Sequence, residues 1–305
     1  MLNHAFLITA HAFPDQLKEI LSALSAPNHY FFINIDKKSK WGQNFIESAK
    51  NSHNLFLEGN ERIDVSHGGF SQIAATLCLL NKAYSKVCVG GGRIDYFHLI
   101  SGQDFPIWSN RKFDSFFKQN EGKSYMLYDS EENHQKWIVN KYPFRIRPYW
   151  FIDLPHGNNP IVKFIKNRLN SVSKHLWIRR MIPGVRAGWN WFSWHRTVAE
   201  FIIRQEKENP FFFKRFHYTF CADEVIFHTL LYPHVKELNI ETTNCLRYVN
   251  WQKKDIKRAN INSPLQLNEE EYEDIINSGA LFCRKIHPVI SAKLKHLLKE
   301  NAERN

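Results

Sequence analysis

The sequence predicts an α/β fold with a mostly parallel central sheet and helices on both of its faces. Short apolar runs at 5–10, 30–35 and 96–100 are typical of buried strands. Between them, residues 15–24 and 70–83 carry apolar side chains at helical spacing. Strands that alternate with helices usually pair in parallel, because each helix returns the chain to the same edge of the sheet. We therefore expect a Rossmann-like sheet whose ligands bind beyond the carboxyl ends of its strands.

The remaining elements are expected in a less regular order. A short strand is predicted at 54–57, and helices are predicted at 198–203 and 225–231. Residues 121–185 are rich in aromatic and basic side chains and have weak periodicity, so we interpret them as an extended, partly helical excursion over one side of the sheet. Residues 291–305 form a terminal amphipathic helix whose charged end, from Lys299, is expected to fray.

Composition indicates a globular protein with a large positive net charge. The chain has 305 residues, of which 43% are hydrophobic and 23% are charged, and its formal net charge is +11. Such a charge favours nucleic acid, anionic lipid or nucleotide phosphates as partners. The basic residues are spread along the sequence, so a general solubilising charge is an equally good interpretation.

Cysteine usage and hydropathy predict a cytoplasmic protein. The five cysteines include no Cys-x-x-Cys pair, which is typical of a reducing compartment. The sequence contains no run of eighteen apolar residues, so no membrane span is predicted. The strand predicted at 5–10 leaves no room for a signal peptide. The three glycines at 90–92 lack the spacing of a phosphate-binding loop, and no His-Glu-x-x-His motif indicates a zinc hydrolase.

Two adjacent carboxylates, Asp223 and Glu224, precede the apolar run at 225–231. An acidic pair in this position often marks only the start of a helix, where carboxylates favour the positive end of the helix dipole. We interpret Asp223 as a helix cap or as a residue that orients Glu224. Aromatic surroundings would desolvate Glu224 and raise its proton affinity, as suits a general base.

Several segments, in register along the chain, resemble the core-2/I-branching β-1,6-N-acetylglucosaminyltransferase family, which includes the peptide O-xylosyltransferases. The resemblance extends from about residue 5 to about residue 290. It is carried by residues 33–39, 67–71, 96–107, 188–194, 221–228, 246–251 and 281–286. The resemblance implies a GT-A-like fold and direct, inverting transfer of a sugar from a UDP-sugar to a hydroxyl group, which gives a β-linkage.

The resemblance also implies how the chain is divided and what it needs. Residues 1–305 would form one glycosyltransferase domain, with a nucleotide-sugar-binding half at about 1–120, an acceptor-binding and catalytic half at about 121–290, and the terminal helix at 291–305. The chain has no Asp-x-Asp motif to hold a divalent metal. We therefore expect a metal-independent reaction with no cofactor, in which Lys or Arg neutralises the leaving diphosphate.

Matches to the family's motifs identify a base and a diphosphate site. Glu224 matches the catalytic base, and Lys285 matches the diphosphate-binding lysine. A second basic residue serves the family nearby, and either Arg284 or Arg258 could supply it. On the local pattern alone, Arg284 and Lys285 could instead be a solvated basic pair at the end of a strand.

A further set of residues matches the segments that frame the nucleotide in the family. The set consists of His11, Asp36, Ser101, Gly102 and Asp104. Asp36 follows a predicted strand, where its carboxylate could accept a hydrogen bond from the uracil or the ribose. Asp104 could alternatively be a turn device, because the proline two residues later restricts the backbone.

Acceptor binding is expected to involve Trp251, Gly188, Asp223 and Lys253. Trp251 matches a tryptophan that the family uses against the acceptor, and sugars present apolar faces that pack on aromatic rings. Gly188 matches a small residue of the family. Asn190 and Trp191 depart from the family pattern, and Trp189 and Trp191 could each be ordinary core residues.

We expect GlcNAc ahead of xylose as the donor sugar. The expected acceptor is a bacterial surface glycan, for example on a lipid carrier at the inner membrane, where the basic surface would suit peripheral docking on anionic lipid. One rival is a basic nucleic-acid-binding protein, but the chain has no binding motif and no basic stripe, so no nucleic-acid partner is expected. The other rival is a glycan-binding member without turnover, and the presence of Glu224 and Lys285 argues against it.

Overall fold

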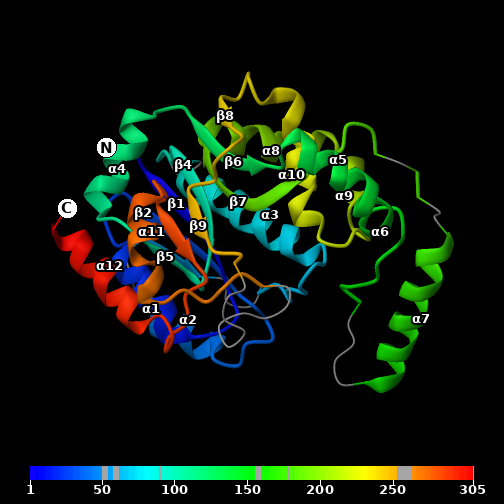
Figure 1. The fold of residues 1–305 in the computed structure, drawn as a ribbon, viewed down its shortest axis with the longest axis horizontal. Helices are drawn as coiled ribbons and strands as arrows, with labels where there is room; N and C mark the ends of the chain where they lie inside the picture. Colours follow the sequence, from blue (N-terminus) through cyan, green and yellow to red (C-terminus); the bar gives the residue numbers. More distant parts are fainter. Residues whose placement is uncertain are drawn as a thin grey trace.

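The computed structural model describes residues 1–49, 54–57, 62–88, 91–154, 159–176, 179–180, 182–252 and 263–304. In Figure 1, a seven-stranded sheet with the order β3-β2-β1-β4-β7-β6-β8 lies beside a three-stranded sheet with the order β5-β10-β9. The strands of the large sheet are β1 (His4–Ala10), β2 (His29–Ile35), β3 (Leu55–Leu57), β4 (Tyr96–Ser101), β6 (Ser124–Tyr128), β7 (Gly188–His195) and β8 (Ile240–Glu241). Those of the small sheet are β5 (Asp104–Pro106), β9 (Arg247–Val249) and β10 (Phe282–Arg284).

The large sheet has the mostly parallel character that the sequence predicted. Strands β3, β2, β1 and β4 are parallel to one another, and β6 is parallel to β8. Strand β7 is antiparallel to both of its neighbours, β4 and β6. Beyond β4, the chain therefore departs from the simple alternation that makes every strand parallel.

Helices cover both faces of this sheet (Figure 1). The helices are α1 (Pro14–Ala23), α2 (Gly42–Ala49), α3 (Ser71–Ala83), α4 (Asn110–Gln119), α5 (Glu131–Asn140), α6 (Tyr142–Arg145), α7 (Pro160–Leu176), α8 (Arg196–Glu208), α9 (Pro210–Lys214), α10 (Ile226–Leu231), α11 (Tyr272–Asn277) and α12 (Ala292–Arg304). Short helical turns are η1 (Tyr84–Cys88), η2 (Ala222–Glu224), η3 (Tyr232–His234) and η4 (Glu269–Glu271). In the described part of the chain, no helix is both long enough and apolar enough to span a bilayer.

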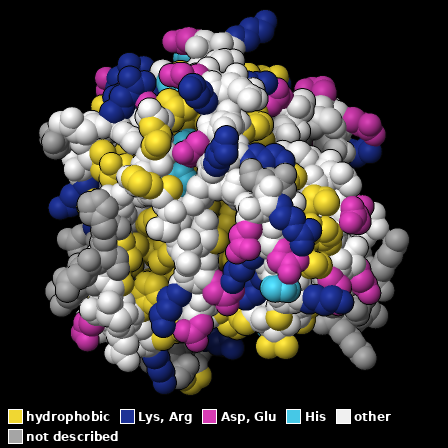
Figure 2. Space-filling view, turned by 90° about the vertical axis from the view of Figure 1, so that its left-hand side faces the viewer, with side chains coloured by type: hydrophobic (Ala, Val, Ile, Leu, Met, Phe, Trp, Pro, Cys, Tyr) yellow, Lys and Arg dark blue, Asp and Glu magenta, His cyan; other side chains and the backbone are white. Residues whose placement is uncertain are grey.

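The basic charge is not gathered into one patch on the face shown in Figure 2. Lys and Arg side chains there are interspersed with Asp and Glu. Helix α12 shows the pattern in detail, since Lys295 and Lys299 lie 2.9 and 3.3 Å from the carboxylate of Glu19 on α1. The helix continues to Arg304, so the expectation that it frays from Lys299 was wrong.

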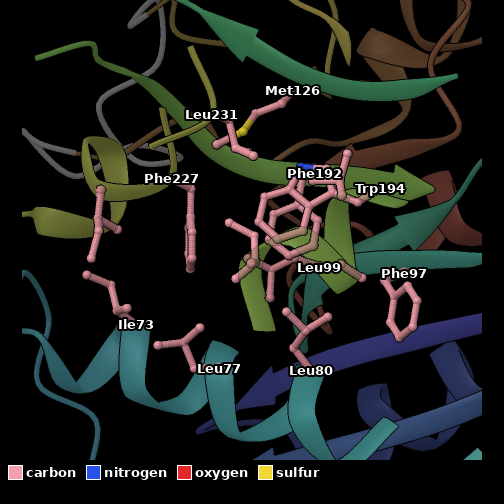
Figure 3. Close-up of a cluster of buried hydrophobic side chains, with 14 of the residues drawn as sticks. Ile73, Leu77, Leu80, Phe97, Leu99, Met126, Phe192, Trp194, Phe227 and Leu231 are labelled. Atoms are coloured by element: carbon pink, nitrogen blue, oxygen red, sulfur yellow. The ribbon is translucent and has the colours of Figure 1, made fainter. Parts of the chain in front are cut away.

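The sheet is buried on both faces because its strands are apolar at consecutive positions. Along β1, Ala5 and Leu7 belong to the core cluster that includes residues of α3, α8 and α10, whereas Phe6 and Ile8 belong to the cluster that includes residues of α1, α4 and α12. In Figure 3, side chains of α3 such as Leu77 extend toward the side chains of β4, β7 and α10. Burial of both faces explains why these strands appear in the sequence as continuous apolar runs.

The interpretation of 121–185 as an excursion over the sheet was only partly right. Its first elements include β6, which lies inside the large sheet, and the following segment at 188–195 is β7, a central strand that we did not predict. These strands were not predicted because β6 has only five residues and because the three tryptophans of β7 favoured its interpretation as a ligand-binding segment. Helices α5, α6 and α7 form the rest of the excursion.

A chain of buried polar side chains crosses the large sheet. Arg247 donates to Ser193 Oγ at 3.2 Å, which lies 2.9 Å from His98 Nδ1. His98 Nε2 lies 3.0 Å from His4 Nδ1, and His4 Nε2 lies 3.5 Å from Asp114 Oδ1. Burial lowers the pKa of His4 to about 3 and that of His98 well below its ordinary value. Donation in one direction, from Arg247 through Ser193 and His98 to His4 Nδ1, serves these hydrogen bonds with both rings neutral, whereas His4 Nε2 makes no hydrogen bond among the described residues.

Candidate active site

Predicted site residues collect at one edge of the large sheet. Asp36 directly follows β2, and Ser101 ends β4. Strand β7 runs antiparallel to β4, with His98 opposite Ser193. Its first residues, 188–191, therefore lie at the same edge as the carboxyl ends of the parallel strands, which is where α/β sheets bind ligands.

Asp104 is the centre of a buried ion pair at this edge. Its Oδ2 accepts hydrogen bonds from the backbone N–H and the hydroxyl of Ser101, both at 2.6 Å. Its Oδ1 lies 3.3 Å from Nη1 of Arg284, and the Asp104 side chain has no exposed surface. Strands β5 and β10 are antiparallel with Arg284 opposite Asp104, so the register of the small sheet creates this pair. Asp104 therefore does more than shape a turn.

Arg284 is enclosed rather than solvated. Its guanidinium carbon lies 3.8 Å from the ring centroid of Trp191, and the residue is buried. A planar guanidinium suits this combination, since it can stack on an aromatic face while its edge meets a carboxylate. The interpretation of Arg284 as part of a solvated basic pair was therefore wrong.

The ammonium of Lys285 contacts a neutral hydroxyl, whereas the guanidinium of Arg284 contacts a carboxylate. Its ammonium donates to Ser263 Oγ at 2.9 Å. Burial, and then the positive charge of Arg284, lower the pKa of Lys285. The backbone at Lys285 is held by hydrogen bonds to Leu265 and from Leu267, at 3.3 and 2.8 Å. The ammonium thus projects from a fixed backbone beside a second cation.

The predicted nucleotide-binding residues His11 and Asp36 are linked to each other. Ser39 donates through its hydroxyl to the carbonyl of His11 at 2.7 Å and through its N–H to the carbonyl of Asp36 at 2.8 Å. The carboxylate of Asp36 accepts the N–H of Lys38 at 2.8 Å and lies 3.3 Å from the Lys38 ammonium. A nucleoside would therefore meet a preformed turn, and the role of both residues in binding it stays a prediction.

Gly102 connects the strand ends to the C-terminal part of the chain. Its N–H donates to the carbonyl of Thr9 at 3.0 Å, and its carbonyl accepts from the Gln16 amide at 2.7 Å. The same amide donates to the carbonyl of Ile286 at 3.2 Å, directly after Lys285. Gln16, on α1, thus holds the loop after β4 against the segment that carries the basic pair.

Glu224 forms an ion pair with Arg145, through its Oε2 and the Nη1 of the arginine. Glu224 lies on the turn η2 and keeps 41% of its side chain exposed, whereas Arg145, at the end of α6, keeps 17%. The turn is anchored at Cys221, whose N–H donates to the carbonyl of Gly68 at 2.8 Å and whose φ of 51° is left-handed. The ion pair requires an ionised Glu224, the form that can accept a proton.

Asp223 is half-buried and accepts hydrogen bonds from two other elements. The amides of Asn190, on β7, and Gln72, on α3, donate to its Oδ2 at 3.1 and 3.4 Å. Its Oδ1 is buried and has no partner among the described residues. Burial, and then the charge of Glu224, raise the pKa of Asp223 to about 7. The carboxylate does not cap α10, whose N-cap is Val225, so our interpretation as a helix cap was wrong.

Two further residues predicted to bind the acceptor have different surroundings. A Cβ on Gly188 would lie 2.1 Å from the carbonyl oxygen of Leu127 and 2.6 Å from His228 Nε2, so only glycine fits between β6 and α10. Trp251 is half-exposed, and its ring lies edge-on to that of Trp189 with 6.3 Å between centroids. It forms an accessible aromatic surface of the kind that sugars use.

Lys253 and Arg258, predicted for the acceptor and the diphosphate, lie outside the described residues.

Sequence reasoning missed Arg145, Trp191, Asn190 and Gln72. Arg145 lies 79 positions before Glu224 and is one of several basic residues in the aperiodic segment at 121–185. Nothing in the local pattern distinguishes it from its basic neighbours. Trp191 and Asn190 could have been inferred only by recognising β7 as a strand that begins at the site.

A possible metal-binding group lies away from this edge. Across the ranges that the structure describes, one set of side chains has suitable geometry: His4, His29 and Asp114, whose ligating atoms lie within 4.8 Å of one another. His4 and His29 begin β1 and β2, whereas the site residues follow the carboxyl ends of the strands. This group is therefore at the opposite edge from Glu224 and Lys285.

Comparison with known proteins connects this geometry to a family. The family model "Core-2/I-Branching enzyme" matches residues 4–276. Human xylosyltransferase 2 is 24% identical over 265 residues, which is 82% of this chain and 27% of that protein. Xylosyltransferase sqv-6 of Caenorhabditis elegans is 25% identical over 295 residues, or 90% of this chain and 33% of that protein. The chain thus spans about a quarter to a third of the length of these relatives.

Among solved structures, that of S. aureus TarS in complex with UDP-GlcNAc matches with a TM-score of 0.29 and 12% identity, over 42% of this chain and 35% of that chain. The family model, by contrast, matches nearly the whole chain and includes every element from β1 to η4 and most of α11. The mostly parallel central sheet with helices on both faces agrees with the fold expected from the sequence. The chain belongs to the Core-2/I-Branching enzyme family.

Proposed function

We propose that the protein is an inverting glycosyltransferase that moves a sugar from a UDP-sugar to a hydroxyl of a saccharide, without a required metal. The observation that carries the proposal is that side-chain contacts connect the basic pair, Arg284 and Lys285, to the acidic pair, Asp223 and Glu224. The Arg284 guanidinium stacks on Trp191 of β7. Asn190, the residue before Trp191, donates a hydrogen bond to Asp223, the neighbour of Glu224. Family membership supports sugar transfer as the chemistry.

In this proposal Glu224 is the general base. Its carboxylate removes the proton from the acceptor hydroxyl while the oxygen attacks the anomeric carbon. The bond from that carbon to the UDP oxygen breaks on the opposite face, so the configuration inverts and UDP leaves with the bonding electrons. Arg145 positions the ionised carboxylate, and the exposed part of Glu224 leaves room for an acceptor.

Lys285 is proposed to stabilise the leaving diphosphate. Arg284 already has a carboxylate partner in Asp104, whereas the described partner of Lys285 is the neutral hydroxyl of Ser263. A fixed ammonium in a partly buried site can neutralise charge that develops as the bond breaks. The chain lacks an Asp-x-Asp motif, and His4, His29 and Asp114 lie at the opposite edge of the sheet, so we propose that this lysine takes the place of a metal.

GlcNAc is the donor sugar that we propose first. Xylose is the second candidate, because the similar curated proteins are named xylosyltransferases. For the acceptor we propose a bacterial surface glycan that is assembled on a lipid carrier at the inner face of the plasma membrane. The half-exposed ring of Trp251, edge-on to Trp189, supports a saccharide as the acceptor.

A donor screen tests the proposal. The protein is incubated with UDP-GlcNAc, UDP-xylose, UDP-glucose or UDP, and both the melting temperature and the release of UDP are measured. We expect UDP and one UDP-sugar to raise the melting temperature, and that sugar to be slowly hydrolysed or transferred. If neither UDP nor any UDP-sugar changes the melting temperature, the protein is not a UDP-sugar transferase.

The same assay in EDTA tests the role of metal. Turnover should survive chelation. A loss of turnover that Mn²⁺ restores would show that the diphosphate requires a metal after all, while leaving the assignment of the donor intact.

A further inference from the structure

Helix α7 (Pro160–Leu176) is packed with its polar side against the protein. The ammonium of Lys166 donates to the carbonyl of Ile152 at 2.5 Å, and the side-chain oxygen of Asn170 accepts the N–H of Phe151 at 2.8 Å. Ser173, one turn further on, accepts the N–H of Tyr149. Lys166, Asn170 and Ser173 follow the spacing of one helix face, so the helix is attached through hydrogen bonds rather than through apolar packing.

The apolar side of α7 consequently faces outward. Its five exposed apolar side chains keep between 40 and 66% of their surface in solvent, and their spacing of three, one, four and three residues forms one stripe. They are Ile161, Phe164, Ile165, Leu169 and Val172. In Figure 1, α7 stands at the side of the molecule, away from the two sheets, so the stripe is presented at the periphery. Soluble monomers rarely expose a contiguous apolar stripe of this kind without a partner.

Charge indicates what the partner is. Residues 160–176 include four basic side chains, Lys163, Lys166, Arg168 and Lys174, and no acidic one. Lys163, Arg168 and Lys174 are exposed along the same helix. Elsewhere, on the face of Figure 2, basic side chains are mixed with acidic ones. A helix that combines an apolar stripe with unbalanced positive charge is suited to the interface of an anionic bilayer, where the rings and aliphatic chains insert and the ammonium groups meet phosphate.

We propose that α7 docks the protein on the surface of an anionic lipid membrane. The helix would lie in the plane of the interface with Phe164 and Ile165 inserted below the headgroups. The segment that holds α7, which includes Tyr149 and Phe151, follows α6, whose Arg145 contacts Glu224. If the proposed transferase function holds, docking through α7 would bring that carboxylate close to a lipid-linked acceptor. The docking itself does not depend on that function.

Vesicle flotation of the full chain, without any sugar nucleotide, tests the proposal. Vesicles of phosphatidylcholine alone are compared with vesicles that also contain phosphatidylglycerol. We expect the protein to float with the anionic vesicles, more strongly at about 0.1 M salt than at about 1 M, because salt screens the lysines. Absence from both kinds of vesicle would overturn the proposal, and equal flotation with both would overturn its electrostatic part.

Two variants separate insertion from charge. Phe164→Ser combined with Ile165→Ser should lower the partition coefficient about tenfold or more, since two large apolar groups no longer enter the bilayer. Lys163→Gln combined with Arg168→Gln should lower it about fivefold for each charge, on anionic vesicles only. The matched control, Phe211→Ser with Val289→Ser, removes two exposed apolar side chains outside α7 and should leave flotation unchanged.

A second copy of the chain is the alternative occupant of the stripe. Light scattering after gel filtration detects it: a dimer that Phe164→Ser with Ile165→Ser converts to a monomer would overturn membrane docking. Because all of these side chains are exposed, the variants should melt at the wild-type temperature, and circular dichroism checks that they are folded. Flotation and sugar transfer are measured separately, so failure of one is not mistaken for failure of the other.

Discussion

The two charged clusters of the candidate site differ in how completely they are satisfied. In the first, the buried Asp104 accepts from Ser101 twice and pairs with Arg284, which also stacks on Trp191. In the second, Glu224 is 41% exposed, and one oxygen of its neighbour Asp223 is buried without a partner among the described residues. The first cluster has little capacity left for a ligand, whereas the second has an accessible carboxylate and an unused acceptor.

The backbone explains the difference. Asp104 and Arg284 are opposite each other in two hydrogen-bonded strands, so the sheet fixes their distance. Glu224 lies on a short helical turn, and its partner Arg145 comes from the excursion that follows β6. We infer that the Asp104 cluster has a structural role, so that its loss lowers the stability of the fold. We infer that the Glu224 cluster has a catalytic role, so that its loss lowers the turnover rate.

The largest effect is expected from Glu224→Gln, which keeps the shape of the side chain but removes the proton acceptor. Turnover should fall by about 10²–10⁴-fold, because that is the usual contribution of a general base. The affinity for UDP should barely change. Initial rates and UDP titrations measure the two quantities. Glu132→Gln removes an exposed carboxylate from α5 and is the matched control. Near wild-type turnover in Glu224→Gln would place the base elsewhere.

Asp104→Asn should act on stability instead. It leaves the guanidinium of Arg284 buried without a counter-charge, and breaking a buried pair from one side typically costs about 3–5 kcal/mol. The free energy of unfolding is measured in urea. Asp15→Asn, which removes an exposed partner of Lys18, should change it by no more than about 0.5 kcal/mol. If Asp104→Asn is as stable as the wild type, the structural role inferred for the Asp104 cluster is wrong.

Lys285→Ala should weaken UDP binding and slow transfer together. Loss of one preorganised charge contact costs about 2–4 kcal/mol at the transition state. UMP lacks the β-phosphate and should bind the variant and the wild type equally well. Lys293→Ala, at an exposed lysine of α12, controls for the loss of a general positive charge. Equal losses for UMP and UDP would indicate that Lys285 supports the fold or the nucleoside rather than the diphosphate.

Much of the fold could be predicted from local patterns. Strands β1, β2 and β4 are apolar at consecutive positions and helices α1 and α3 have apolar stripes, so periodicity alone located them. Strands β6 and β7 were missed because one is short and the other is rich in tryptophan. Their pairing depends on neighbours that are distant in the sequence, such as Tyr125 opposite Ser193.

Candidate site residues that lie in a family motif could be located from the sequence. Residues that only tertiary contacts bring to the site could not. Glu224 and Lys285 were located by family motifs, and their catalytic roles stay predictions. Arg145 and Trp191 could not be located in this way, because a salt bridge or a stacking contact leaves no trace in the local sequence. The burial of Arg284 is a further example, since a basic pair at a strand end is usually solvated.

The smallest effect concerns the pH dependence of stability at Asp223. Its folded pKa, about 7, lies above the ordinary aspartate value of 3.8 because the carboxyl is buried and next to Glu224. Between those values the native state binds the proton more tightly than the unfolded chain, so this group's contribution to stability is complete below pH 4 and is lost as the pH rises through 7. The slope for one group cannot exceed about 1.4 kcal/mol per pH unit.

Asp223→Asn cannot titrate, so the free energy of unfolding of the wild type relative to this variant should decline from pH 4 to pH 8. Urea unfolding at several pH values measures the decline. A wild-type advantage that grows with pH at Asp223 would mean that the carboxylate, rather than the carboxylic acid, is the stable form there. The two clusters would then be alike in holding a satisfied anion, and the open character of the Glu224 cluster would rest on solvent exposure alone.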